Sequence, residues 1–229
     1  LCLLRGWFGA DKVSADCQGA VALVGLETRE PDFPLTGLVV DKGFGLEGLA
    51  DEFLLRIEAG QIRQGFASTP DLNVDPVLIA SHILVALQQV ISRNASPKQP
   101  TVLSFGRVEA DGATNIVPDE VRVAGTFRAL DEQWRERGLG HIRSIAEGLA
   151  ESMGGKCIVE ISRGYPFLNN DVSLTRRIRG YAADYLGQDN VEEIDLTLGS
   201  EDFAWYSQVV PASFYRLGTR NEQKGITGY

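Results

Sequence analysis

The chain has 229 residues, of which 44% are hydrophobic and 23% charged, a composition typical of a globular protein with a core of its own. Acidic residues number 31 and basic residues 22, and the net charge of -9 argues against the basic surface that nucleic-acid binding requires. The three cysteines form no Cys-x-x-Cys pair, and no uninterrupted apolar run approaches the length of about 18 residues of a membrane span. We therefore expect a cytoplasmic protein without a disulfide framework, a nucleic-acid partner or a membrane segment.

The first predicted element is a strand in the apolar run 20–26. A continuous apolar stretch of this kind is typical of a strand buried on both faces of an α/β sheet. The chain begins with Leu1 and ends at Tyr229 without a charged helical tail, so we expect a segment truncated at both ends.

The middle of the chain predicts four strands and two helices. The strands are expected at 53–57, 101–109, 121–128 and 157–161. Asp75 and Pro76 suit the cap and first turn of one helix, whose apolar stripe is Ile79, Ile83, Leu87, Val90 and Ile91. The second helix is expected over 131–153, with Ile142, Ile145, Leu149 and Met153 as its stripe and Gly154-Gly155 as its end. The order β-α-β-β-α-β predicts a ferredoxin-like domain, whose helices cover one face of the sheet.

The C-terminal part predicts a second set of α/β elements. A helix is expected over 172–186 with Leu174, Ile178, Tyr181 and Tyr185 on one side, followed by a strand at 191–196, a short helix at 200–207 and a strand at 213–217. The predicted fold class is therefore α/β. A ferredoxin-like domain (50–165) is expected to be inserted in a partial α/β domain formed by 1–49 and 166–229.

Four motifs follow one another along the chain: Asn73-Val74-Asp75-Pro76, the stretch from Gly112 to Glu120, Gly125-Thr126-Phe127-Arg128 and Ser200-Glu201-Asp202-Phe203. Together they resemble the two-metal aminoacylase and carboxypeptidase family, which includes hippurate hydrolases, N-acyl-amino-acid amidohydrolases and indoleacetyl-amino-acid hydrolases. The resemblance extends from about Ala50 to Thr219. It implies a catalytic α/β domain with two divalent metal ions and a ferredoxin-like satellite domain that mediates homodimerisation.

The resemblance implies amide hydrolysis by a water activated on zinc, manganese or cobalt. Where the family has Gly-Leu-His after a buried strand, this chain has Gly25-Leu26-Glu27, so Glu27 is the predicted metal ligand. The family's other ligands come from His- and Glu-rich motifs and a final histidine that this sequence does not contain. We therefore expect that this chain alone binds no metal pair and is inactive.

A further departure concerns the satellite histidine that polarises the scissile carbonyl in a Gly-Gly-His motif of the family. The corresponding stretch here is Gln64-Gly65-Phe66. Asp71 stands where the family has a later histidine in the same loop. A phenylalanine cannot donate a hydrogen bond to an oxyanion, so this contact is expected to be lost.

Other family positions are retained. The resemblance implies that Asn115 contacts the substrate near its scissile amide and that Arg128 binds the substrate's terminal carboxylate, a task suited to a guanidinium fork. From the residues alone, Asn115 is a turn residue and Arg128 a solvated charge on a strand. Glu201 and Asp202 follow a predicted helix cap at Ser200, where carboxylates are stabilised by the positive end of the helix dipole. The alternative is that they contact the metal ligands without binding the metal themselves.

The two histidines are expected to be structural, His82 as a packing or surface residue and His141 as an exposed one. Two functions remain. The chain is part of a metal-dependent amidohydrolase or peptidase that cleaves N-acyl amino acids or small peptides, or it is a catalytically dead relative that serves as a dimerising or ligand-binding module. Both predict a homodimer through the first satellite helix and its neighbouring edge strand.

Overall fold

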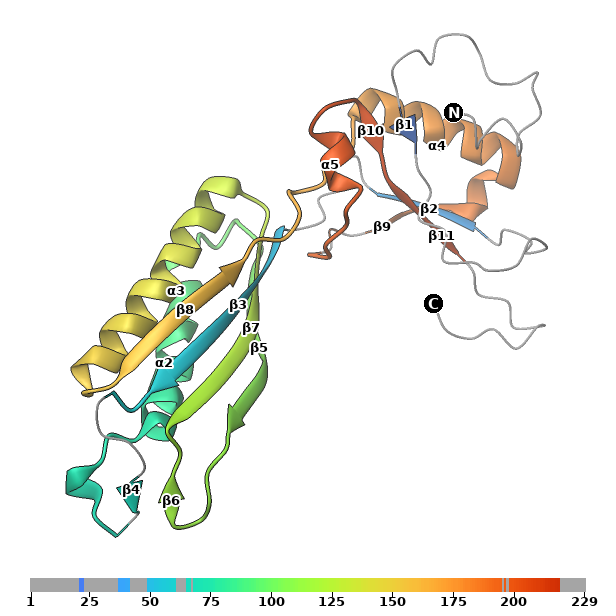
Figure 1. The fold of residues 1–229 in the computed structure, drawn as a ribbon. Helices are drawn as coiled ribbons and strands as arrows, with labels where there is room; N and C mark the ends of the chain where they lie inside the picture. Colours follow the sequence, from blue (N-terminus) through green and yellow to red (C-terminus); the bar gives the residue numbers. More distant parts are fainter. Residues whose placement is uncertain are drawn as a thin grey trace, which may run out of the picture. The chain divides into compact units, whose positions relative to one another are not determined.

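The computed structural model describes residues 21–22, 37–41, 49–60, 65–66, 68–194, 196 and 198–218. The chain divides into two compact units (Figure 1). The first, the satellite domain, comprises residues 48–165 together with Leu198–Ser200. The second, here called the split unit, comprises residues 1–47, 166–197 and 201–229.

The satellite domain is an antiparallel sheet with the strand order β5-β7-β3-β8. Its strands are β3 (Leu49–Glu58), β5 (Thr101–Ala110), β7 (Glu120–Ala129) and β8 (Lys156–Ser162). Two helices, α2 (Pro76–Gln89) and α3 (Glu132–Ser152), cover one face of the sheet (Figure 1). The predicted ferredoxin-like order is confirmed. Strand β3 begins four residues earlier than expected, because it pairs with β7 from Leu49 to Glu58.

The core of the satellite domain lies between the sheet and the two helices. The inward positions of β7, Val121, Val123 and Phe127, are fully buried, as their alternation predicts. They belong to one cluster with the predicted stripe residues of α2, among them Ile79, Ile83 and Leu87.

Helix α3 approaches the core more closely than its sequence suggests. Its buried line consists of Leu139, Ile142, Ala146 and Ala150, whereas the expected Ile145, Leu149 and Met153 are only partly buried. Small residues on this line allow the close approach. Gly138 is the extreme case, since a Cβ at this position would lie 2.3 Å from the Phe127 ring.

The helix ends follow the predicted capping chemistry. Oδ1 of Asp75 accepts hydrogen bonds from the backbone N–H groups of Val77 (2.8 Å) and Leu78 (3.2 Å), with Pro76 in the first turn. Gly154 follows α3 with φ +80°, and the Gly155 N–H bonds to the Ala150 carbonyl at 2.9 Å. The expected start of α2 and end of α3 are therefore confirmed.

Helix α2 continues into a π turn, η2 (Val90–Asn94). Together, Pro76–Asn94 have the length and mean hydropathy, 1.3, of a helix that could cross a membrane, although polar residues interrupt the apolar run. The finding is weak evidence for a membrane segment. One side of the helix is packed in the satellite core, and core helices often pass the same test.

The described residues of the split unit form two small sheets. One has the order β11-β2-β9, from β11 (Tyr215–Gly218), β2 (Gly37–Asp41) and β9 (Val191–Ile194); the other pairs β1 (Val21–Ala22) with β10 (Ala212–Ser213). Helix α4 (Val172–Leu186) has the predicted bounds, and two short helices, η3 (Gln188–Asn190) and α5 (Ala204–Ser207), complete the described part. Strand β1 lies within the predicted strand 20–26, whose other residues are outside the described ones.

Three expectations for the split unit need correction. The strand expected at 213–217 is broken at Phe214, because the buried Asn170 side chain accepts from the Phe214 N–H (2.6 Å) and donates to its carbonyl (2.9 Å). The strand expected at 191–196 ends at Ile194. Tyr181 and Tyr185 are exposed, and Thr175 and Ala182 of α4 are buried together with the predicted Leu174.

Candidate substrate-binding site

Asn115 lies at the tip of a hairpin beyond strands β5 and β7. Thr114 and Asn115 form a two-residue turn, closed by reciprocal backbone hydrogen bonds of 3.1 Å between Ala113 and Ile116. The Asn115 side chain is exposed. Asn115 is therefore a turn residue, as expected, and its exposed carboxamide is accessible to a ligand.

The same tip carries the position of the missing satellite histidine. Strand β4 (Gly65–Phe66) pairs with β6 (Ile116–Val117), and Phe66 is the backbone partner of Ile116, the residue after Asn115. A Cβ at Gly65 would lie 1.8 Å from the Asn73 carboxamide, so a larger residue here would displace the Asn73 side chain. Asp71 is exposed in the short helix η1 (Pro70–Leu72). The fold thus brings the backbone of position 66 close to Asn115.

Arg128 lies near the opposite end of β7, opposite Ala50 of β3 and Val102 of β5. Its side chain is half-buried, and Nη1 donates a 2.7 Å hydrogen bond to the carbonyl of Leu198. The description as a solvated surface charge is therefore wrong. The bond uses one donor of the guanidinium, and a carboxylate can be bound by the others.

The structure does not bring Asn115 and Arg128 together. Asn115 precedes β7 and Arg128 is next to its last residue. Eight residues separate Glu120 from Arg128 along the strand, which corresponds to roughly 25 Å at the usual rise. An amino-acid-sized substrate cannot contact both side chains of one chain.

Glu201 and Asp202 do not occupy the first turn of a helix. Helix α5 begins at Ala204 instead of Ser200, and the carbonyls of Glu201 and Asp202 accept from the N–H groups of Ala204 and Trp205, each at 3.1 Å. The side chain of Glu201 is half-buried and that of Asp202 is exposed. The expected helix cap at Ser200 is therefore wrong.

The histidines lie away from any carboxylate cluster in the described residues. His82 is exposed on α2. His141 is half-buried instead of exposed, because its ring packs beside Trp134 at a centroid distance of 6.3 Å.

Within the described ranges, no three His, Cys, Asp or Glu side chains are grouped so that they could hold a metal ion. Glu27 lies outside these ranges. Burial raises the pKa of the Cys157 thiol to about 12, which disfavours the thiolate that a metal would need. The described part of the chain does not fit a two-metal site.

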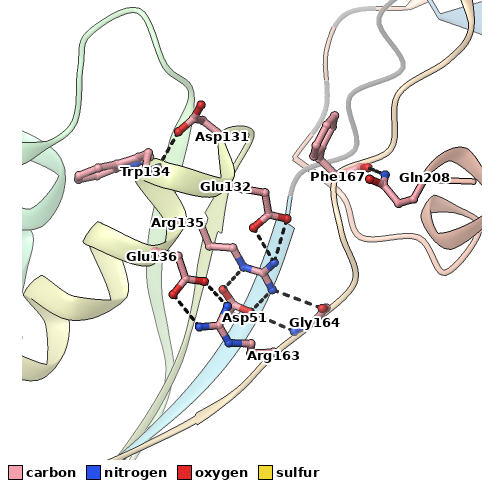
Figure 2. Close-up of polar contacts among 10 residues, drawn as sticks. All are labelled: Asp51, Asp131, Glu132, Trp134, Arg135, Glu136, Arg163, Gly164, Phe167 and Gln208. Carbon is pink, nitrogen blue, oxygen red and sulfur yellow. Dashed lines mark hydrogen bonds and ion pairs between the residues drawn. The ribbon is translucent and has the colours of Figure 1, made fainter.

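A polar cluster that the sequence analysis missed lies at the other end of the satellite domain from Asn115 (Figure 2). Asp51 and Arg135 are both buried, with exposed fractions of 0% and 4%. Arg135 donates from Nε to Oδ2 of Asp51 (2.6 Å) and from Nη2 to Oδ1, and the Gly164 N–H donates to Oδ1 at 3.0 Å. The Asp51 carboxylate raises the pKa of Arg135 above its usual value.

The sequence contained a signal for this pair. Asp51 alternates in phase with the inward-facing Phe53 and Leu55, and Arg135 is one helical turn before Leu139 on the buried line of α3. A charge at each of two core-facing positions predicts a buried ion pair, because neither could be buried alone.

Comparisons with known proteins agree with this architecture. Residues 54–153 match a peptidase dimerisation domain. The N-acetylcysteine deacetylase of Bacillus subtilis is 31% identical over 218 residues, which cover 94% of this chain and 56% of the relative. Thermostable carboxypeptidase 2 of Saccharolobus solfataricus is 32% identical, with 70% of this chain and 40% of the relative covered.

A solved structure, a dinuclear metal-binding peptidase of the M20 family from Bacillus subtilis, has a TM-score of 0.61 at 26% identity. The similarity covers 87% of this chain and 48% of that one. The chain spans about half the length of the curated relatives it matches. Residues 54–153 are therefore a peptidase dimerisation domain, and most of the chain is similar to one part of the two-metal aminoacylase and carboxypeptidase family, the M20 peptidases.

Proposed function

We propose that the protein is the substrate-binding and dimerising part of a metal-dependent amidohydrolase that acts on N-acyl amino acids or small peptides. The observation that carries this proposal is the satellite domain itself, which presents Asn115 at its hairpin tip and a half-buried Arg128 near the end of β7. Relatives named as an N-acetylcysteine deacetylase and a carboxypeptidase support this substrate class.

The roles assigned to these residues are binding and orientation. The guanidinium of Arg128 binds the terminal carboxylate of the substrate through the donors that the Leu198 carbonyl does not use. The carboxamide of Asn115 hydrogen-bonds the substrate near its amide. In the family, zinc, manganese or cobalt activates the attacking water; the described residues do not fit such a site, and no step is assigned to them.

The separation of Asn115 and Arg128 supports a homodimer as the binding unit. Helix α2 exposes Val77, Leu78 and Val85, and the edge strand β5 exposes Val102 and Val108. An apolar helix face beside an unpaired strand edge favours a two-fold interface, which would bury more than about 1,000 Å2. In this dimer one substrate contacts Arg128 of one chain and Asn115 of the partner subunit.

Calorimetry with N-acetylcysteine tests the proposed pocket. Arg128→Ala should weaken binding roughly 10-fold or more, because a charge-assisted hydrogen bond is lost. Arg122→Ala is the matched control, since Arg122 lies on the same face of β7 and pairs with Glu120. Equal binding by all three proteins would remove Arg128 from the pocket.

We also expect no release of amino acid above background from hippurate or acetylated amino acids, even with added zinc, manganese or cobalt. Glu27 is the one ligand predicted from the sequence, and catalytic metal sites use about three protein ligands. Metal-dependent turnover that disappears with Glu27→Ala would show that this expectation is wrong and that the chain completes its own site.

The second candidate function is a dimerising or ligand-binding module without catalysis. The observation that favours it is Phe66, whose backbone is paired beside Asn115 at the position of the family's histidine. Elemental analysis separates the two functions. Two equivalents of metal in the purified protein would favour the enzyme, whereas metal-free protein that still binds N-acetylcysteine would favour the module.

A further inference from the structure

The buried Asp51–Arg135 pair lies where the chain enters and leaves the satellite domain. Two of the boundaries between the units are at 47/48 and 165/166, and Leu198–Ser200 belong to the satellite domain separately. Asp51 follows the entry by a few residues, and Gly164 immediately precedes the exit. Both connections therefore pass the same ion pair.

The contacts join three segments that are distant in sequence. The Asp51 carboxylate, on β3, accepts from Arg135 of α3 and from the Gly164 N–H after β8. Arg135 Nη2 also donates to the Gly164 carbonyl at 3.3 Å, so the peptide groups on both sides of this glycine are held. Glu132 lies on the outer side of Arg135, with Nη1 at 3.2 and 3.3 Å from its two carboxylate oxygens (Figure 2).

A buried ion pair contributes little net stability, because desolvation offsets most of the attraction, and apolar residues could fill the same volume. The pair does restrict the relative positions of the segments that it joins. A carboxylate that accepts from a guanidinium fork and a backbone N–H permits only a narrow range of positions for each segment. This geometry suits a contact whose role is positioning.

We propose that Arg135 is a positioning residue that, through Asp51, clamps the entry and exit segments to the end of the satellite domain. The domain is then rigid up to Asp51 and Gly164, and at these two connections the chain can move only beyond them. The clamp is next to the proposed carboxylate site, since Asp51 follows Ala50, the β-sheet partner of Arg128.

Hydrogen exchange of the whole chain, followed residue by residue by NMR, tests the clamp. Gly164 lies outside any helix or strand, and an exposed amide there would exchange freely. With the clamp formed, its amide should exchange at least about 10-fold more slowly than the exposed loop amides of Asp111 and Gly112, in the range of the β8 amides. Exchange as fast as in that loop would overturn the proposal without any variant.

The double variant Asp51→Leu/Arg135→Met separates clamping from stability. It leaves no unpaired charge buried, so the fold should be retained. The Gly164 amide should then exchange at least about 10-fold faster, while the core amides of β7 stay unchanged. Equal acceleration of the β7 amides would indicate that the variant only lowers the stability of the domain. Unchanged exchange at Gly164 would show that the pair does not hold this segment. Either result would contradict the clamp.

The matched control is Arg163→Met, which breaks the exposed ion pair between Arg163 and Glu136 on the same two segments. It should leave the Gly164 amide protected. The same loss of protection in Arg163→Met as in the double variant would assign the effect to the exposed pair and overturn the role of Arg135. The readout needs neither substrate nor metal, so the clamp can hold even if the proposed function fails.

Discussion

The satellite domain and the split unit differ in how their cores are made. In the satellite domain, residues from four strands and two helices form one apolar cluster, and all of these elements come from one continuous stretch. In the described part of the split unit, the buried apolar residues form two small clusters, one around Val191 and Tyr215 and one around Leu168 and Phe203. Its strands are also distant in sequence, since β1 at 21–22 pairs with β10 at 212–213.

In the split unit, buried side-chain hydrogen bonds also hold segments together. The buried hydroxyls of Thr175 and Ser213 are hydrogen-bonded at 2.9 Å, and the Asn170 side chain holds the backbone of Phe214. Such contacts fix geometry but contribute less to stability than a large apolar core. The two units should therefore unfold with different stabilities and respond differently to the same type of substitution.

The largest expected effect is a core truncation in the satellite domain. Phe127→Ala should lower the free energy of unfolding of this unit by about 3–5 kcal/mol, because the fully buried ring leaves a cavity. Leu174→Ala in α4 should cost about 2 kcal/mol, at the low end of such substitutions, because Leu174 belongs to neither cluster of the split unit. Calorimetric unfolding should show two transitions, each shifted by one variant. A single transition shifted by both would show that the two units unfold as one.

A smaller effect tests the close approach of α3 to the sheet. Gly138→Ala should destabilise the satellite domain by about 1–3 kcal/mol, because the added methyl would overlap the Phe127 ring. Gly148→Ala, on the same helix with no atom within 4 Å of the new Cβ, should stabilise it by up to about 1 kcal/mol. Urea unfolding of both variants measures the difference, and stabilisation by both would contradict the packing described.

The smallest effect is the pH dependence of α4 in the split unit. Oδ1 of Asp171 accepts from the Leu174 N–H (2.8 Å) and the Ser173 hydroxyl (2.7 Å), and these bonds lower the pKa of Asp171 below its usual 3.8. A lowered folded-state pKa contributes stability that is complete above the unfolded-state value and is lost as the pH falls through the folded-state value. The Tm of the split unit should therefore fall more steeply than that of Asp171→Asn as the pH drops from about 3.8 towards the lower folded-state pKa, and parallel curves would contradict the assignment.

The sequence was most informative where structure depends on neighbouring residues. The Asp75 cap, the glycine end of α3 and the alternation of β7 each follow from local chemistry, and the structure has them where they were expected. Asn115 was recognisable as a turn residue for the same reason.

What could not be predicted depends on contacts between distant residues. Arg128 is held by Leu198, and β10 and β11 are separated by Asn170, in each case across a long sequence separation. The Asp51–Arg135 pair also joins distant elements, but the sequence indicates it through a charge at each of two core-facing positions. Glu27 lies outside the described residues, so its role as a metal ligand stays a prediction.

Light scattering of the purified chain at tens of micromolar tests the central claim, that the satellite domain makes this protein a homodimer, most directly. We expect a molar mass of twice the chain mass of 25.0 kDa. Val85→Asp, on the exposed face of α2, should reduce the mass to that of one chain, whereas Val209→Asp, equally exposed in the split unit, should leave the dimer intact. A wild-type mass of 25.0 kDa would contradict the dimer and, with it, a substrate shared by Arg128 and the Asn115 of the partner subunit.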